Sequence, residues 1–117
     1  MTNEKLSWVM RQYLFSLGIY PKYKGYRELL HAMQIVYGDF TTLYDVHNNI
    51  YVPVAEELHT TPHAIECNLR TVSARAYKVN KAELERVCRQ PLNKPLSATN
   101  LILTACEGVA LLVKDMG

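Results

Sequence analysis

The stretch VPVAEELHTTPHAIECNLRTVSARAYKVN, residues 52–80, decides the fold because it predicts two helices separated by a short break. The first segment carries a short apolar stripe at i, i+1 and i+4: Val54, Ala55 and Leu58. In the break, residues 59–61, the Thr61 hydroxyl can cap the next helix, and Pro62 suits the first helical position because no N–H is needed there. The pattern predicts a helix-turn-helix over about residues 50–78, although a generic helical hairpin would give the same pattern.

The second helix of this stretch is amphipathic. Its buried stripe recurs at i, i+4, i+7 and i+11: Ile65, Leu69, Val72 and Ala76. Its other face collects polar and small side chains: His63, Glu66, Cys67, Arg70, Thr71 and Ala74. In a helix-turn-helix protein, such a face enters the major groove of DNA, and residues further along the helix lie nearer the phosphates. The alternative is an ordinary solvated face with a Glu66–Arg70 ion pair.

The exposed face supplies candidates for two kinds of DNA contact. Arg70 is the best candidate for a bidentate contact to guanine, and Glu66 could accept a hydrogen bond from a cytosine amino group. The base-reading candidates are His63, Glu66, Cys67, Arg70 and Thr71. The phosphate-contact candidates are Thr61, Arg75, Lys78 and Lys81. If this face reads DNA, the partner is double-stranded DNA.

Three blocks of sequence, in this order, resemble one protein family. The blocks are KGYRELLHAMQIVYGDF (24–40), AEELHTTPHAIECNLRTVSARAY (55–77) and KPLSATNLI (94–102). They resemble the C-terminal effector domain of the stage-zero sporulation master regulator, a response regulator of endospore-forming Firmicutes, from about Leu14 to Leu112. The most specific parts are Lys24-Gly25-Tyr26, Val36-Tyr37 with Asp39, Thr60-Thr61, Glu66 with Arg70, and Lys94-Pro95. The resemblance implies an all-helical domain that binds a short asymmetric DNA box, with a TGTCGAA-type core, through its helix-turn-helix.

The chain departs from this family inside the second helix. The family has arginines where this chain has Ala64 and Cys67, whereas Glu66 and Arg70 match it. A good bidentate contact supplies about 1–3 kcal/mol of discrimination between bases. We therefore expect the fold to be inherited and the preferred DNA box to differ.

The family's regulator also carries a phosphoacceptor receiver domain ahead of this one, which the 117-residue sequence does not contain. Met1 followed by the polar residues Thr2, Asn3 and Glu4 favours a natural start, and hence a stand-alone relative over a fragment. The length fits one domain with a single core, spanning residues 1–117.

Composition predicts a folded, cytoplasmic protein. Hydrophobic residues make up 49% of the chain, which excludes wholesale disorder. We find no apolar run that approaches the length of a membrane span and no signal-peptide core, so we expect no membrane partner. The three cysteines are Cys67, Cys88 and Cys106. Their odd number and irregular spacing predict free thiols in a reducing compartment.

Periodicity and capping signals predict an all-α domain of five to six helices. The expected segments are Glu4–Leu17 ended by Gly18, Tyr26–Tyr37 ended by Gly38, Asp39–Leu58 as one kinked helix or two, a short helix capped by Asn80, and Asn100–Val113 capped by Ser97 or Thr99. The last of these, helix 100–113, is more apolar than one stripe needs. It is either a well-buried core helix or a homodimer contact, and the sequence leaves both open.

Charge is unevenly distributed along the chain. Residues 1–38 carry five Lys/Arg and two Asp/Glu, and residues 62–81 carry four and one, so each segment has a net charge of +3. Residues 39–61 carry four acids and no bases, so this stretch has to face away from phosphates. In the link 19–25, lysines and tyrosines alternate. Such a link could follow a nucleic-acid backbone, or could pack its tyrosines on the core and expose its lysines.

Catalytic and metal sites are not expected. His59, His63 and Cys67 are spaced four apart and Cys88 could add a fourth ligand, but the turn breaks the helical register and no close cysteine pair accompanies them. No phosphate-cradling glycine loop, nucleophile elbow or defensible carboxylate pair occurs, so we expect no enzyme, no cofactor and no small-molecule substrate.

The competing function is a helical protein-interaction module that kept the fold and lost specific DNA binding. Ala64, Cys67 and the acidic stretch 39–61 favour this alternative. The retained Glu66 and Arg70 and the positive charge of residues 62–81 oppose it.

Overall fold

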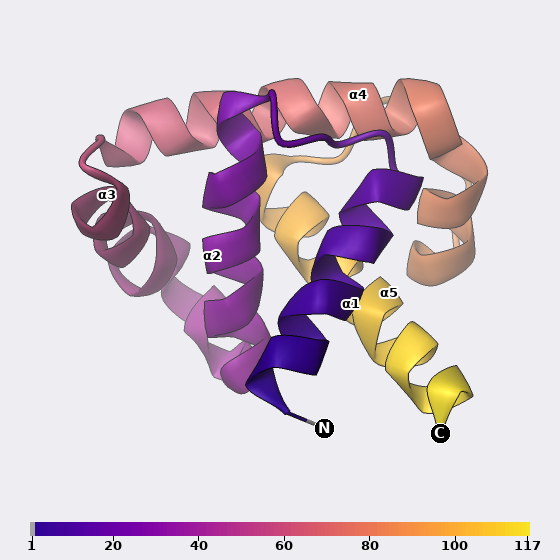
Figure 1. The fold of residues 1–117 in the computed structure, drawn as a ribbon. Helices are drawn as coiled ribbons and strands as arrows, with labels where there is room; N and C mark the ends of the chain where they lie inside the picture. Colours follow the sequence, from indigo (N-terminus) through magenta and orange to yellow (C-terminus); the bar gives the residue numbers. More distant parts are fainter. Residues whose placement is uncertain (1) are drawn as a thin grey trace.

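The computed structural model describes residues 2–117, and every regular element in this range is helical. The elements are α1 (Asn3–Ser16), α2 (Lys24–Gly38), the 3₁₀ segment η1 (Phe40–Asp45), the π turn η2 (His47–Tyr51), α3 (Val52–Leu58), α4 (Pro62–Cys88) and α5 (Ala98–Met116). The long α4 lies across one side of the molecule, with α1, α2 and α5 beneath it and α3 at its start (Figure 1). The all-α prediction is confirmed.

The helices begin where capping side chains satisfy free backbone N–H groups. The Thr61 hydroxyl accepts a hydrogen bond from the Ala64 N–H at 3.1 Å, and the Ser97 hydroxyl accepts one from the Asn100 N–H at 3.2 Å. The Asn80 side chain accepts from the Glu83 N–H at 3.3 Å. Asn80 has the non-helical angles φ −148° and ψ 57°, so the predicted short helix follows the first part of α4 across a kink without an intervening loop.

Residues 40–58 are helical throughout, as either form of the expected Asp39–Leu58 segment required, but they pass through three types of helix. Asp39 caps the start of η1 by accepting from the Thr41 N–H at 2.9 Å, and η1, η2 and α3 then follow one another. The Asp45 carboxylate accepts from the backbone and side chain of Asn48, at 3.2 and 2.8 Å. Because Asp45 engages the chain at this point, the expected interruption at His47-Asn48-Asn49 becomes a π turn.

Several predicted helix ends were wrong by two or three residues. α2 begins at Lys24 and not at Tyr26, and α5 begins at Ala98 and continues to Met116, beyond the expected Val113. Gly18 takes φ +78° after α1, as predicted for a glycine that ends a helix. Gly38 is still helical, and the extended Asp39 follows it.

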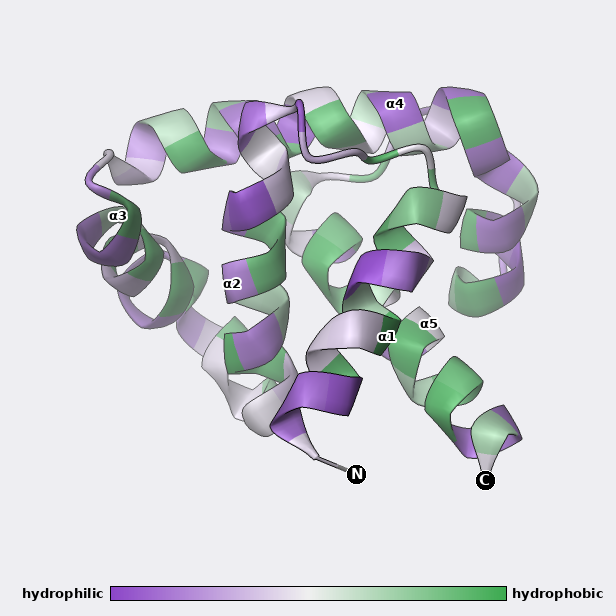
Figure 2. Ribbon diagram, in the orientation of Figure 1, coloured by the Kyte–Doolittle hydropathy of each residue, from purple (hydrophilic) through white to green (hydrophobic). Residues whose placement is uncertain are grey.

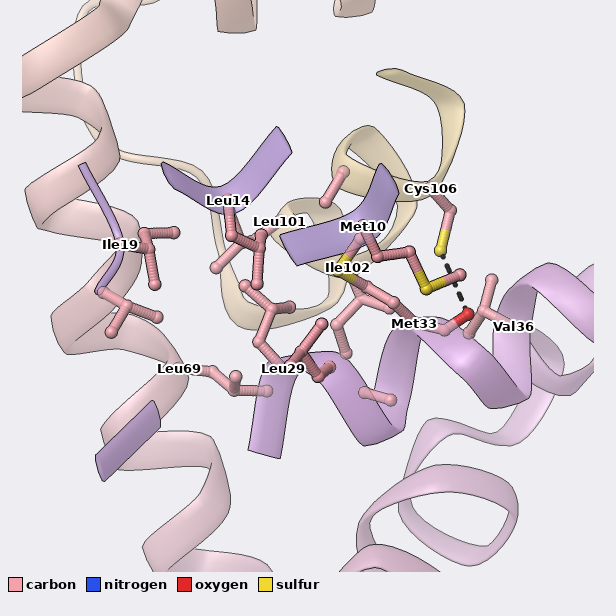
Figure 3. Packing of buried hydrophobic residues seen from close by; sticks show 14 of the residues in the cluster. Met10, Leu14, Ile19, Leu29, Met33, Val36, Leu69, Leu101, Ile102 and Cys106 are labelled. Atoms are coloured by element: carbon pink, nitrogen blue, oxygen red, sulfur yellow. Dashed lines mark hydrogen bonds between the residues drawn. The ribbon is translucent and has the colours of Figure 1, made fainter. Parts of the chain in front are cut away.

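The core lies where α1, α2, α4 and α5 meet. Figure 3 shows Met10 and Leu14 of α1, Leu29 and Met33 of α2, Leu69 of α4, and Leu101 and Ile102 of α5 around one centre, and all seven are fully buried. The predicted stripe of α4 is buried as expected: Ile65, Leu69, Val72 and Ala76. Truncating a leucine in such a core to alanine typically costs about 2–5 kcal/mol.

The N-terminal end of α2 crosses α4 at close range because Gly25 has no side chain. A Cβ atom at Gly25 would lie 2.7 Å from the main-chain oxygen of Asn68. Ile19, in the link before α2, is fully buried. These contacts hold residues 19–25 beside the first half of α4. Within residues 2–117, we find no helix that is both long and apolar enough to span a membrane.

Candidate nucleic-acid interface

The turn between α3 and α4 fixes the angle at which α4 leaves the rest of the domain. His59 takes the left-handed conformation, with φ +55°, and the next residue, Thr60, donates its N–H to the Ala55 carbonyl at 2.9 Å. Thr61 is extended and caps α4, and Pro62 occupies the start of that helix. The result is the tight turn that the sequence predicted, with the capping hydroxyl and the proline in their expected places.

The predicted base-reading residues share the solvent-facing side of α4, opposite the buried stripe. His63, Arg70 and Thr71 are exposed, and Glu66 and Cys67 are half-buried. Figure 2 shows the same alternation as polar and apolar bands along α4. The five side chains therefore form one surface over the first three turns of α4, which we call the reading face.

Glu66 and Arg70 contact each other on the reading face. Glu66 Oε1 accepts a hydrogen bond from Arg70 Nη2 at 2.7 Å, and the side chains are 45% and 59% exposed. An exposed pair with this spacing stabilises a helix by roughly 0.2–0.5 kcal/mol, so it can be exchanged for a stronger partner at small cost. Glu66 thus orients the Arg70 guanidinium group without burying it, and leaves its remaining N–H donors free for a ligand.

His63 and Cys67 form a second contact on the reading face. Their Nε2 and Sγ atoms lie 3.6 Å apart, and Thr71 Oγ1 donates to the Cys67 carbonyl at 3.2 Å. Across the described range, no three His, Cys, Asp or Glu side chains are grouped so that they could hold a metal ion. His63, Cys67 and Thr71 are short side chains, so their hydrogen-bonding atoms lie close to the backbone of α4.

The phosphate candidates fall into two groups. Thr61, Lys78 and Lys81 are exposed, and Lys81 Nζ lies 5.3 Å from the Tyr77 ring centroid. Arg75 is half-buried, and its Nε donates to the Gly18 carbonyl oxygen at 3.2 Å. Because this hydrogen bond engages Arg75 inside the protein, a phosphate contact by Arg75 competes with it and stays a prediction.

Part of the acidic stretch faces α2 and not the reading face. Glu57 of α3 lines a shallow groove of about 350 Å³ together with His31 and Gln34 of α2. Glu57 therefore borders α2.

The structure brings the lysines of the link to α4 together with Arg27 and Glu28, which the sequence did not single out. The link and the start of α2 border a groove of about 480 Å³ against the turn and α4; its polar lining includes Lys22, Lys24, Arg27, Glu28, Thr60 and Asn68. Glu28 is buried, and its Oε2 accepts from Asn68 Nδ2 at 3.3 Å. Its Oε1 has no hydrogen-bond partner among residues 2–117. Burial raises the pKa of Glu28, while the Asn68 hydrogen bond and the charge of Lys24 partly offset this shift.

Residues 10–105 match the family model described as "Sporulation initiation factor Spo0A C terminal". The chain belongs to this family. The family is a DNA-binding domain of a sporulation regulator and not an enzyme family, which confirms the resemblance inferred from the three sequence blocks. A search of curated protein sequences gave no match.

The match to the Spo0A C-terminal family covers the turn, the whole reading face and the link before α2. The chain is accordingly a DNA-binding domain of the transcription-regulating type. Of the two positions expected to depart from the family, Cys67 lies on the reading face, and Ala64 lies on the side of α4 that borders the groove with the link.

Proposed function

We propose that this domain is a sequence-specific transcription regulator that reads the DNA major groove with α4. The observation that carries the proposal is that residues 10–105 match a DNA-binding family while the second helix of the helix-turn-helix exposes Arg70 opposite the core. Arg70 would bind guanine with two N–H groups, and Glu66 would hold Arg70 or accept from a cytosine amino group. His63, Cys67 and Thr71 are the further base-reading residues. Such an activity would take place in the cytoplasm.

Thr61, Lys78 and Lys81 would contact phosphates at the two ends of the reading face. Thr61 precedes α4, so it lies at the positive end of the helix dipole, which favours a negatively charged ligand although the Ala64 N–H is already donated to the Thr61 hydroxyl. Lys78 and Lys81 lie near the kink at Asn80. Phosphate contacts fix the position of the helix but carry no sequence information, so specificity rests on the five base-reading residues.

The expected DNA preference differs from that of the family. Ala64 and Cys67 cannot make the base or phosphate contacts that arginines make, and a lost bidentate base contact removes about 1–3 kcal/mol of discrimination. Specificity would then be concentrated on the bases that Arg70 and Glu66 reach.

A second candidate function, a protein-interaction module, rests on a different surface. α5 and the second part of α4 border a groove of about 710 Å³ whose apolar lining includes Phe40, Val87, Leu96, Leu103, Ala110 and Leu111. The inner face of α5 is buried, as the core alternative predicted, while Leu103 and Leu111 remain only partly covered. We propose that homodimerisation uses this outer face of α5. Sedimentation of Leu111→Glu beside wild type tests it, because loss of a wild-type dimer is the expected result.

The test of the main proposal is fluorescence anisotropy with three labelled duplexes at two salt concentrations. One duplex carries the TGTCGAA-type box, one carries the scrambled box, and one is the sequence that the domain recovers from a random pool. Tighter binding to either unscrambled duplex supports a sequence reader. Equal, salt-dependent binding to all three would show a DNA binder without specificity, and no binding at low salt would favour the protein-interaction function.

A further inference from the structure

The link between α1 and α2, together with the first turn of α2, presents a basic surface beside α4. Residues 18–27 contain three basic residues and no acidic one. All three, Lys22, Lys24 and Arg27, are exposed, and they border the groove shared with Thr60 of the turn and Ala64 of α4. The small side chain of Ala64 leaves this groove open.

Contacts with α4 hold the link in place. Arg75 donates to the Gly18 carbonyl, and its Cζ lies 5.8 Å from the Tyr20 ring centroid and 6.0 Å from that of Tyr23. The two tyrosine rings are stacked, with centroids 6.2 Å apart and planes 21° apart. Gly25 then brings the start of α2 against Asn68. The segment that carries the basic side chains is therefore held against α4 by these contacts.

The same contacts decide what the link can bind. Tyr20 packs on Phe15 and Tyr23, and Lys22 Nζ lies 5.4 Å from the Tyr23 ring, so the aromatic rings are already engaged. They are poorly placed to stack on bases. Among residues 2–117 no carboxylate forms an ion pair with Lys22, Lys24 or Arg27, although Lys22 lies over the Tyr23 ring. This favours phosphate over base stacking as the ligand.

The position of the link relative to the reading face also favours phosphate as the ligand. Ala64, Asn68 and Arg75, at i, i+4 and i+11, lie on one flank of α4, about a quarter turn from the reading face. The major groove is about 12 Å wide, close to the diameter of a helix with its side chains, so a helix in the groove has a phosphate backbone along each flank. The link lies along one of those flanks (Figure 1).

We propose that Lys22, Lys24 and Arg27 form a second, sequence-independent DNA contact that binds the phosphate backbone beside α4. The proposal rests on the proposed function, because it assumes that the reading face enters the major groove. Glu28 lines the same groove and opposes an anion there, but its carboxylate is buried against Asn68. The groove therefore carries three exposed cationic side chains against one buried carboxylate, and this balance favours an anion.

The test compares two triple variants with the same change in net charge. The first is Lys22→Ala/Lys24→Ala/Arg27→Ala. The control, Lys5→Ala/Arg11→Ala/Lys114→Ala, removes exposed cations from α1 and from the end of α5. Affinity for the preferred duplex and its scrambled form is measured by anisotropy over a range of salt concentrations, and thermal melting confirms that both variants fold.

The link variant should lose affinity for both duplexes by the same factor. Its slope of log affinity against log salt should become shallower by about 0.9 for each lost contact, or about 2.7 in total. The control should keep the wild-type slope. Wild-type affinity and slope in the link variant would overturn this inference while leaving the reading face intact. A wild-type protein that binds neither duplex would overturn the proposed function and this inference together.

Discussion

Arg75 Nε donates to the carbonyl oxygen of Gly18 at 3.2 Å, and this hydrogen bond joins α4 to the link before α2 across 57 positions of sequence. Because the contact uses the directed N–H of the guanidinium group, we expect Arg75→Lys to lower stability by roughly 0.5–1.5 kcal/mol despite the retained charge. Urea unfolding measures this change. The control is Lys78→Arg at an exposed position of the same helix. An unchanged midpoint would contradict a stabilising role for this hydrogen bond.

Cys67 should act as a reporter of DNA on the reading face. It is half-buried there, whereas Cys106 is fully buried and burial raises the pKa of its thiol to about 12, so Cys106 should not react. We expect bound duplex to slow maleimide labelling of Cys67 at least several-fold. Cys88 borders the α4–α5 groove and serves as the internal control, because its labelling rate should not change. Equal protection of both thiols, or of neither, would contradict this placement.

Glu28 should make stability depend on pH in an unusual direction. Burial raises the pKa of this carboxyl above its unfolded value, so the folded state prefers the protonated form. The stabilisation from this group is present below the unfolded pKa and is lost as pH rises through the raised folded pKa. Glu28→Gln removes the buried charge, so its melting temperature should exceed that of wild type at pH 7.

The difference between Glu28→Gln and wild type should shrink as the pH is lowered through the raised pKa of Glu28. Glu57→Gln controls for the loss of one negative charge, because Glu57 is exposed. Melting curves at several pH values make the comparison. A Glu28→Gln variant that is less stable than wild type at pH 7 would show that the Asn68 hydrogen bond outweighs the cost of burial.

Gly25 and Gly38, both in α2, differ in the room that each leaves for a side chain. A Cβ at Gly25 would meet the main-chain oxygen of Asn68 at 2.7 Å, and a backbone atom cannot move aside as a flexible side chain can. Gly25→Ala should therefore cost about 1–3 kcal/mol. A Cβ at Gly38 would meet no atom of residues 2–117 within 4 Å, so Gly38→Ala should be neutral or stabilising by up to about 1 kcal/mol. Chemical denaturation measures the stability of both variants, and equal losses of stability would contradict this packing.

Local patterns in the sequence were enough to predict most of the fold. The caps at Thr61, Asn80 and Ser97 depend on residues three positions away, and the stripe of α4 depends on a period that one helix repeats. The break at residues 59–61 was predicted for the same reason. The π turn at residues 47–51 was not, because its signal was a weak interruption of periodicity.

The candidate site was only partly predictable, because the residues that flank the reading face are placed by contacts between segments far apart in the sequence. The reading face follows from helical spacing, so its residues lie together as expected. The partner of Arg75 is Gly18, and the neighbour of Asn68 is Glu28, and no spacing rule connects such pairs. The alternating lysines and tyrosines of the link gave a signal, but only the packing of Tyr20 and Tyr23 showed which of the two groups is free.

The most direct test of the reading face is the affinity of Arg70→Ala for the duplex that wild type prefers and for its scrambled form. We predict a loss of preference of roughly 5- to 150-fold, equivalent to about 1–3 kcal/mol, with nearly unchanged affinity for the scrambled duplex. The melting temperature should stay close to that of wild type, because the Arg70 side chain is 59% exposed. An Arg70→Ala variant that keeps the full wild-type preference would contradict the assignment of α4 as the helix that reads DNA through Arg70.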